Sequence, residues 1–107
     1  AFIGGLLSIK PIMSIEEGEI AGVERVRGSN RVFPRILELM HSRIRPGAPI
    51  DVIVLHADDE PRGKRWLADV KSEFNCRRTW LTDCGPIVGT HAGPGTIAVA
   101  WVEPMRI

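Results

Sequence analysis

The sequence predicts an α/β protein of the α+β kind: a two-layer sandwich with helices on one face of a mixed β-sheet. Two observations indicate this fold. Short runs typical of strands recur along the chain, and two longer segments between them carry apolar residues at helical spacing. Each helical segment has a single apolar stripe, so each is expected to pack on a sheet from one side. The opposite sheet face then needs a cover from outside these residues.

Composition limits the class of protein. The 107 residues are enough for one domain, and 44% hydrophobic with 25% charged residues is ordinary for a soluble globular protein. A net charge of +1 argues against a nucleic-acid platform, which normally carries a basic excess. Two cysteines do not make a disulfide framework. No secretory signal or membrane-length apolar run is present, so we expect a cytoplasmic protein.

The first half of the chain predicts a hairpin followed by a helix. Residues 10–15 and 20–26 are strand-like and are joined by a tight turn over 16–19, where Gly18 tolerates a positive φ. Ser29 and Asn30 are candidate helix caps. The helix that follows carries its apolar stripe at Val32, Phe33, Ile36, Leu37, Met40 and Ile44.

The second half predicts alternating strands and helices. Residues 50–55 form a nearly continuous β-branched apolar run, which is typical of a buried strand. The segment 56–59 is expected to complete that strand and to cap the next helix through Asp58 or Asp59. Strands are expected over 77–82 and 96–102. The three tryptophans, Trp66, Trp80 and Trp101, are expected in the core.

The most distinctive feature is the glycine- and proline-rich segment 85–95, which contains Thr90 and His91. Its glycines permit close approach of the backbone to a ligand, and its prolines stiffen it. A hydroxyl and an imidazole on a stiff segment can hold a carboxylate. The alternative is a structural turn whose histidine is exposed or bonded to backbone. The segment lacks the Lys-Ser or Lys-Thr of a phosphate-binding P-loop.

Other polar residues give weaker signals. Arg25 and Arg27 lie two apart on a strand and share a face, which fits either an anion site or a solvated surface cluster. Cys76 and Cys84 do not have the usual spacing of zinc ligands, and we expect no metal site and no cofactor. Neither a Ser-His-Asp nor a Cys-His arrangement can be argued, so we expect no catalytic residue in this chain.

Two segments together resemble the DegV family. One is Gly5-Leu6-Leu7-Ser8-Ile9-Lys10-Pro11-Ile12, followed by a hairpin with Glu17-Gly18 at its turn. The other is Gly85-Pro86-Ile87-Val88-Gly89-Thr90-His91-Ala92-Gly93-Pro94-Gly95, continuing into the last strand. The resemblance covers the whole chain and identifies residues 1–107 as the C-terminal lobe of the DegV fold, with the N-terminal lobe missing. Ala98 stands where family members often have glycine.

The resemblance implies a binding protein and not an enzyme. DegV-like proteins hold a long-chain fatty acid between two lobes and present its carboxylate to a separate ATP-dependent fatty-acid kinase. It implies that His91 lies beside the carboxylate, with Thr90 and Gly93 shaping its surroundings and Arg27 near the kinase-facing mouth. Apolar walls for the acyl chain would come from Leu6, Leu7, Ile9, Ile12 and Ile87.

Two other hypotheses stay open. A fold-level likeness to dihydroxyacetone kinase would make His91 a nucleophile that forms a covalent adduct with a small ketone. Alternatively, the chain is an inactive fragment that folds only with its other lobe. The first residue, Ala1, is not an initiator methionine and opens an apolar segment, which we expect to pack against preceding residues.

Overall fold

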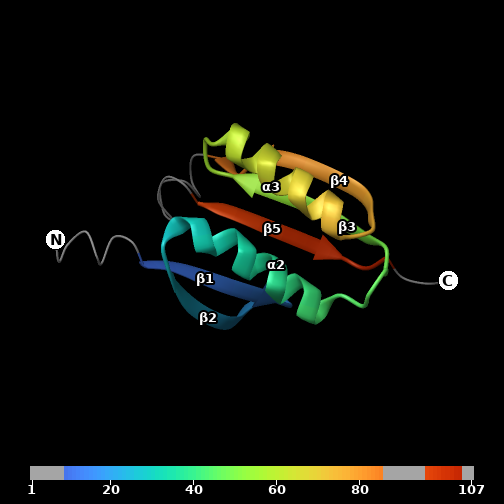
Figure 1. The fold of residues 1–107 in the computed structure, drawn as a ribbon, viewed down its shortest axis with the longest axis horizontal. Coiled ribbons are helices and arrows are strands. Elements are labelled where there is room, and N and C mark those ends of the chain that lie inside the picture. Colours follow the sequence, from blue (N-terminus) through green and yellow to red (C-terminus); the bar gives the residue numbers. More distant parts are fainter. Residues whose placement is uncertain (1–8, 86–95, 105–107) are drawn as a thin grey trace. The chain divides into compact units, whose positions relative to one another are not determined.

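The computed structural model describes residues 9–85 and 96–104 of the chain, which divides into two compact units, Ala1–Ile44 and Arg45–Ile107. Figure 1 shows the elements in chain order, and the predicted order of strands and helices is confirmed. The described elements are β1 (Ile9–Glu16), β2 (Glu19–Arg27), the 3-10 helix η1 (Ser29–Arg31), α2 (Val32–Arg43), β3 (Ile50–His56), α3 (Glu60–Glu73), β4 (Cys76–Asp83) and β5 (Ile97–Val102).

The first unit begins with the predicted hairpin, in which β1 pairs with β2 in antiparallel register. Its two turn residues, Glu17 and Gly18, both have positive φ, 53° and 80°. Tight two-residue hairpin turns favour this geometry because its twist matches that of the flanking strands. The register shifts between Ser14 and Ile15, where a bulge interrupts the ladder.

The start of the first long helix differs from the sequence prediction. Ser29 and Asn30 were expected to cap it, but they lie in the short 3-10 helix η1, and α2 begins at Val32. Arg31 is the N-cap of α2 and makes no side-chain capping hydrogen bond. Gly28, with φ 91°, turns the chain out of β2 into η1. The chain therefore enters α2 through a tighter helical turn, without a side-chain cap.

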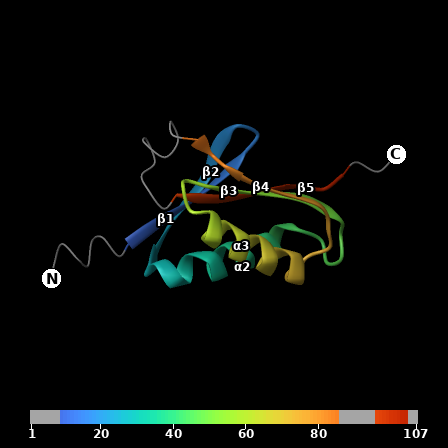
Figure 2. The same ribbon diagram turned by 90° about the horizontal axis from the view of Figure 1, so that it is seen from above.

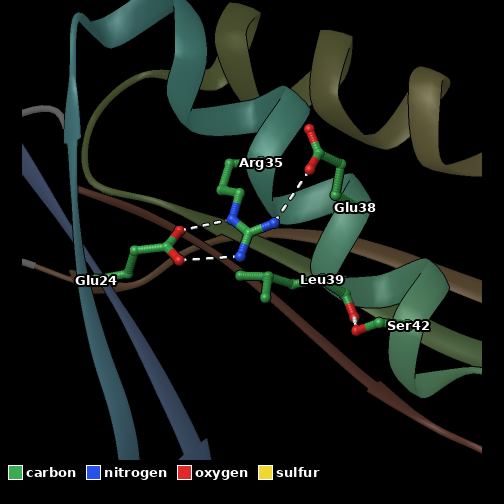
Figure 3. Close-up of polar contacts among 5 residues, drawn as sticks. All are labelled: Glu24, Arg35, Glu38, Leu39 and Ser42. Atoms are coloured by element: carbon green, nitrogen blue, oxygen red, sulfur yellow. Dashed lines mark hydrogen bonds and ion pairs between the residues drawn. The ribbon is translucent and has the colours of Figure 1, made fainter.

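An arginine clamp ties α2 to the hairpin (Figure 3). The Arg35 guanidinium donates to both carboxylate oxygens of Glu24 in β2, from Nε at 2.7 Å and from a terminal nitrogen at 2.9 Å. It also donates to Glu38 at 3.0 Å, one turn further along α2. Two parallel bonds to one carboxylate fix the guanidinium plane, so the clamp sets how α2 lies on β2.

This clamp predicts an acid-sensitive contribution to stability. The hydrogen bond from Arg35 lowers the pKa of Glu24 below its ordinary 4.5. A carboxylate with a lowered folded-state pKa stabilises the fold above its ordinary pKa, and this stabilisation is lost as pH falls through the lowered value. Unfolding in urea at pH 7 and pH 3 should therefore show a smaller pH effect in Arg35→Met than in the wild type. An equal pH effect in both proteins would contradict this, and Arg31→Met, which replaces an exposed arginine at the start of α2, is the control.

The second unit contains a mixed sheet, as predicted, with the strand order β4-β3-β5. The central strand β3 is parallel to β4 and antiparallel to β5. Within this unit α3 lies along one face of the sheet (Figure 2). Asp59 caps α3 by accepting a hydrogen bond from the Arg62 N–H, and Pro61 lies in the first turn, so the predicted start of this helix is confirmed.

The core of the second unit lies between α3 and the sheet. Alternate residues of β3 are buried, and so are Trp66 and Val70 of α3. The expectation that all three tryptophans are core residues is confirmed for Trp66 alone, because Trp101 is half-buried and Trp80 is 49% exposed. Trp80 pairs with Ile53, which lies on the side of β3 that faces away from α3. Among the described residues, no helix is both long and apolar enough to cross a membrane.

Candidate functional site

The two attachment points of the glycine-rich segment meet at the end of β3. Because β3 and β4 are parallel and β5 is antiparallel, β4 ends and β5 begins at the same edge of the sheet (Figure 1). The Cys84 N–H donates to the His56 carbonyl at 2.8 Å, and the Ala57 N–H donates to the Thr96 carbonyl at 2.9 Å. The chain on both sides of residues 86–95 is therefore bonded to the dipeptide His56–Ala57.

The Asp83 carboxylate adds two hydrogen bonds at the place where residues 86–95 are attached to the sheet. We call these attachment contacts, together with those to His56–Ala57, the base of the glycine-rich segment. One oxygen accepts the Gly85 N–H at 2.8 Å, and the other accepts the Asp58 N–H at 3.3 Å. Asp58 has φ 54°, a left-handed conformation that aspartate adopts more readily than most residues. A single carboxylate thus joins the turn after β3 to the first residues after β4.

His56 is buried beneath the same edge, with 6% of its surface exposed. Its Nδ1 accepts the Asp59 N–H at 3.1 Å and lies 3.8 Å from an Asp83 carboxylate oxygen. A ring nitrogen that accepts a backbone N–H carries no proton, so the neutral ring has its proton on Nε2. The sequence placed His56 correctly at the strand end but gave no sign of these contacts.

A glycine in α3 makes room for this histidine. A Cβ at Gly63 would lie 3.1 Å from His56 Cδ2 and 2.8 Å from Leu81 Cδ1. Both distances are shorter than the ordinary separation of packed carbon atoms. The helix therefore approaches β3 and β4 closely because residue 63 has no side chain.

Most of the predicted site residues fall outside the described residues. Thr90, His91, Gly93 and Ile87 belong to residues 86–95, and Leu6 and Leu7 precede β1. The backbone of Ile9 begins β1, but its side chain is not among those described. The roles of these seven residues stay predictions, and the structure adds the frame to which four of them are attached.

The two described members of the predicted site lie on the hairpin. Ile12 is buried and pairs with Glu24, so it shares the face of the hairpin that carries the clamp to α2. Arg27 is exposed at the end of β2 and pairs with Ile9. Arg25 is also exposed and lies on the same face as Arg27, as the strand spacing predicted. The function of Arg27 stays a prediction.

The cysteines and acidic groups of the described residues give no indication of a metal site. Within residues 9–85 and 96–104, no three His, Cys, Asp or Glu side chains are grouped as metal ligands would be. Both cysteines are free thiols, and burial raises the pKa of Cys76. A raised pKa keeps this thiol protonated and poorly reactive at neutral pH.

The role of Asp83 can be tested directly. Asp83→Ala removes the acceptor of two backbone N–H groups. Each hydrogen bond from a backbone N–H to a carboxylate contributes about 1–2 kcal/mol to stability. We expect amide hydrogen exchange at Asp58 and Gly85 to rise by roughly 5- to 30-fold. Asp69→Ala, on the exposed side of α3, is the control. Unchanged exchange at both amides would show that the carboxylate does not hold this base.

Comparisons with known proteins agree with one another. The sequence profile of a family described as "Uncharacterised protein, DegV family" matches residues 1–104. A DegV domain-containing protein of Halalkalibacterium halodurans is 30% identical over 99 residues, which cover 92% of this chain and 35% of that protein. The chain thus spans about a third of the length of this relative.

Solved structures of longer proteins contain the same fold. A DegV lipid-binding protein from Thermotoga maritima is 28% identical with a TM-score of 0.78, and the match covers 94% of this chain and 36% of that one. The structure of DegV from Bacillus subtilis, described as a fatty acid binding protein, is 28% identical with a TM-score of 0.73 over the same shares. Because the family profile matches residues 1–104, which is almost the whole chain, the chain belongs to the DegV family.

Proposed function

We propose that this chain is the C-terminal lobe of a two-lobed protein that binds a long-chain fatty acid. Here the two-lobed protein means a polypeptide of the relatives' length that contains this chain. Two relatives of known structure are described as lipid-binding and fatty-acid-binding. The observation that carries the proposal is the common base of the glycine-rich segment, which is bonded on both sides to His56–Ala57.

This base suits a segment that must hold one polar group in place. In open parallel α/β sheets, ligands bind beyond the carboxyl ends of the strands. The parallel pair β3 and β4 has its carboxyl ends at this place. The segment contains His91 and Thr90, whose imidazole and hydroxyl are able to donate hydrogen bonds to a carboxylate. In the proposal these groups orient the acid, and the other lobe supplies the opposite wall.

The acyl chain provides most of the affinity. Burial of about 14 methylenes is worth on the order of 10 kcal/mol before ordering costs, at ~0.8 kcal/mol for each CH₂. The polar contacts then decide which end of the ligand faces outward.

We further propose that a separate ATP-dependent kinase in the cytoplasm phosphorylates the bound fatty acid. The bound carboxylate oxygen attacks the γ-phosphorus of ATP, ADP leaves, and an acyl phosphate remains on the carrier. Arg27, exposed at the end of β2, is proposed to lie near the mouth through which the kinase reaches the carboxylate. This chain supplies binding groups and the partner supplies the phosphoryl-transfer machinery.

Native mass spectrometry of the purified two-lobed protein tests the ligand class. We expect a co-purifying mass that is released by denaturation and equals that of a long-chain fatty acid. Recovery of the protein without such a mass, and failure to take up added oleate or palmitate, would refute the proposal. A covalent mass increase after incubation with a short ketone and reduction would instead favour the histidine-adduct hypothesis.

A further inference from the structure

The buried residue His56 lies at the centre of the base of the glycine-rich segment. Its carbonyl accepts the Cys84 N–H at 2.8 Å, on the side of β4. The next residue, Ala57, donates its N–H to the Thr96 carbonyl at 2.9 Å, on the side of β5. The backbone of residues 56 and 57 is therefore bonded to both ends of the segment, so a change in its conformation reaches both ends.

The His56 side chain fixes the turn that follows this backbone. Its Nδ1 accepts the Asp59 N–H at 3.1 Å, so the imidazole bridges the turn from residue 56 to residue 59. Within this turn Asp58 has a φ of 54°, in the left-handed region. Such conformations persist where the surrounding contacts hold them. The hydrogen bond to Nδ1 is a contact of this kind.

Packing confines the imidazole on its other edge. The Cδ2 atom of His56 faces Gly63 of α3, where a Cβ would lie only 3.1 Å away. On the Nδ1 edge, the Asp83 carboxylate lies 3.8 Å from the ring and accepts the Asp58 and Gly85 N–H groups. A side chain that is confined by packing and by hydrogen bonds is suited to hold a neighbouring binding group in one geometry.

We propose that His56 is a positioning residue for carboxylate recognition, because its imidazole holds the base that fixes both ends of the glycine-rich segment. This inference rests on the proposed function, in which Thr90 and His91 of that segment meet the fatty-acid carboxylate. In the proposal His56 does not contact the acid and acts through the backbone of residues 56–59. Loss of the imidazole therefore weakens recognition of the carboxylate and leaves burial of the acyl chain unchanged.

Two amide replacements separate the hydrogen bond at Nδ1 from the presence of a polar side chain. In His56→Asn the side-chain oxygen takes the position of Nδ1 and still accepts the Asp59 N–H. In His56→Gln the amide group lies one bond further out, near the position of Nε2, and no acceptor remains at the position of Nδ1. The two variants therefore differ in the one contact on which the proposal depends.

Hydrogen exchange of the two-lobed protein, measured at single amides, tests the effect on the base. We expect exchange at Ala57, Asp59 and Cys84 to rise at least about 10-fold in His56→Gln and to return close to the wild-type rate in His56→Asn. The Val54 amide, in the centre of β3, reports on unfolding of the whole sheet and should change much less.

Binding of two ligands by the two-lobed protein, after removal of bound lipid, tests the effect on recognition. Oleate and oleyl alcohol have the same chain, but only oleate has a carboxylate. We expect the ratio of their dissociation constants, which measures the preference for oleate, to fall roughly 10-fold in His56→Gln, as for one lost hydrogen bond to a charged group. The preference should recover in His56→Asn, and affinity for oleyl alcohol should stay the same. Val70→Ala, which truncates a buried side chain near the end of α3, is the control for lowered stability and should keep the preference.

Each other outcome has a definite meaning. An unchanged preference for oleate in a folded His56→Gln protein would overturn the proposal, and so would an equal loss of affinity for both ligands or an equal rise of exchange at Val54. A wild-type protein that does not distinguish the two ligands would refute the proposed function, while hydrogen exchange would still decide whether His56 holds the base. If His56→Gln does not fold, Gly63→Ala takes its place, because the new Cβ displaces the ring, and the same two changes are expected.

Discussion

Replacing His91 with alanine in the two-lobed protein should lower the rate of acyl-phosphate formation by roughly 10- to 100-fold, because a hydrogen bond to a charged group contributes about 1.5–3 kcal/mol. The loss should appear with a saturating kinase partner and ATP, measured as hydroxamate after trapping with hydroxylamine. In the proposed function the acyl chain provides most of the affinity, so the fatty acid should still co-purify with the variant.

Two controls separate this result from general damage. His41→Ala removes an exposed histidine of α2 and should leave the rate unchanged. His91→Gln retains a hydrogen-bond donor and should recover part of the activity. A normal rate in His91→Ala would remove His91 from the proposed site, while loss of the bound fatty acid together with the rate would show that His91 holds the ligand and does not merely orient it.

Replacing Trp66 with alanine should lower the free energy of unfolding by about 3–5 kcal/mol, the usual effect of truncating a buried aromatic residue. Trp66 is 5% exposed and lies on the face of α3 that packs against the sheet. The Arg62 guanidinium lies 5.1 Å from the centre of its ring, so the truncation also removes a cation–π contact. Urea denaturation followed by circular dichroism measures the loss.

The conservative replacement Trp66→Phe serves as the matched control. It keeps an aromatic ring in the core and should cost clearly less than Trp66→Ala. If both variants were as stable as the wild type, α3 would not depend on this residue for its packing against the sheet.

Local signals in the sequence predicted the elements well where one residue type has a strong conformational preference. Gly18 located the hairpin turn, and the apolar run at 50–55 located the central strand. The capping prediction at Ser29 and Asn30 failed because those side chains are equally compatible with a 3-10 turn, and the choice depends on the path out of β2.

The candidate site shows a different limit. Sequence pattern singled out segment 85–95, but it gave no indication that Asp83 bonds to Asp58 or that His56 accepts the Asp59 N–H. The first contact depends on how β4 pairs with β3, which no local pattern encodes. The exposure of Trp80 was missed for a related reason, since an exposed apolar residue on a strand has the same sequence signature as a core residue.

The antiparallel pairing of β3 with β5 has a consequence for synthesis of the chain on the ribosome. Asp51 of β3 pairs with Val102 of β5, which is synthesised about 50 residues later. The side of β3 that pairs with β5 therefore stays unpaired until nearly all of the unit has been made. An unpaired apolar strand edge is prone to add strands from other chains. A premature stop shortly before β5 would therefore yield a product that aggregates, and such truncated chains would depend on chaperones or be degraded.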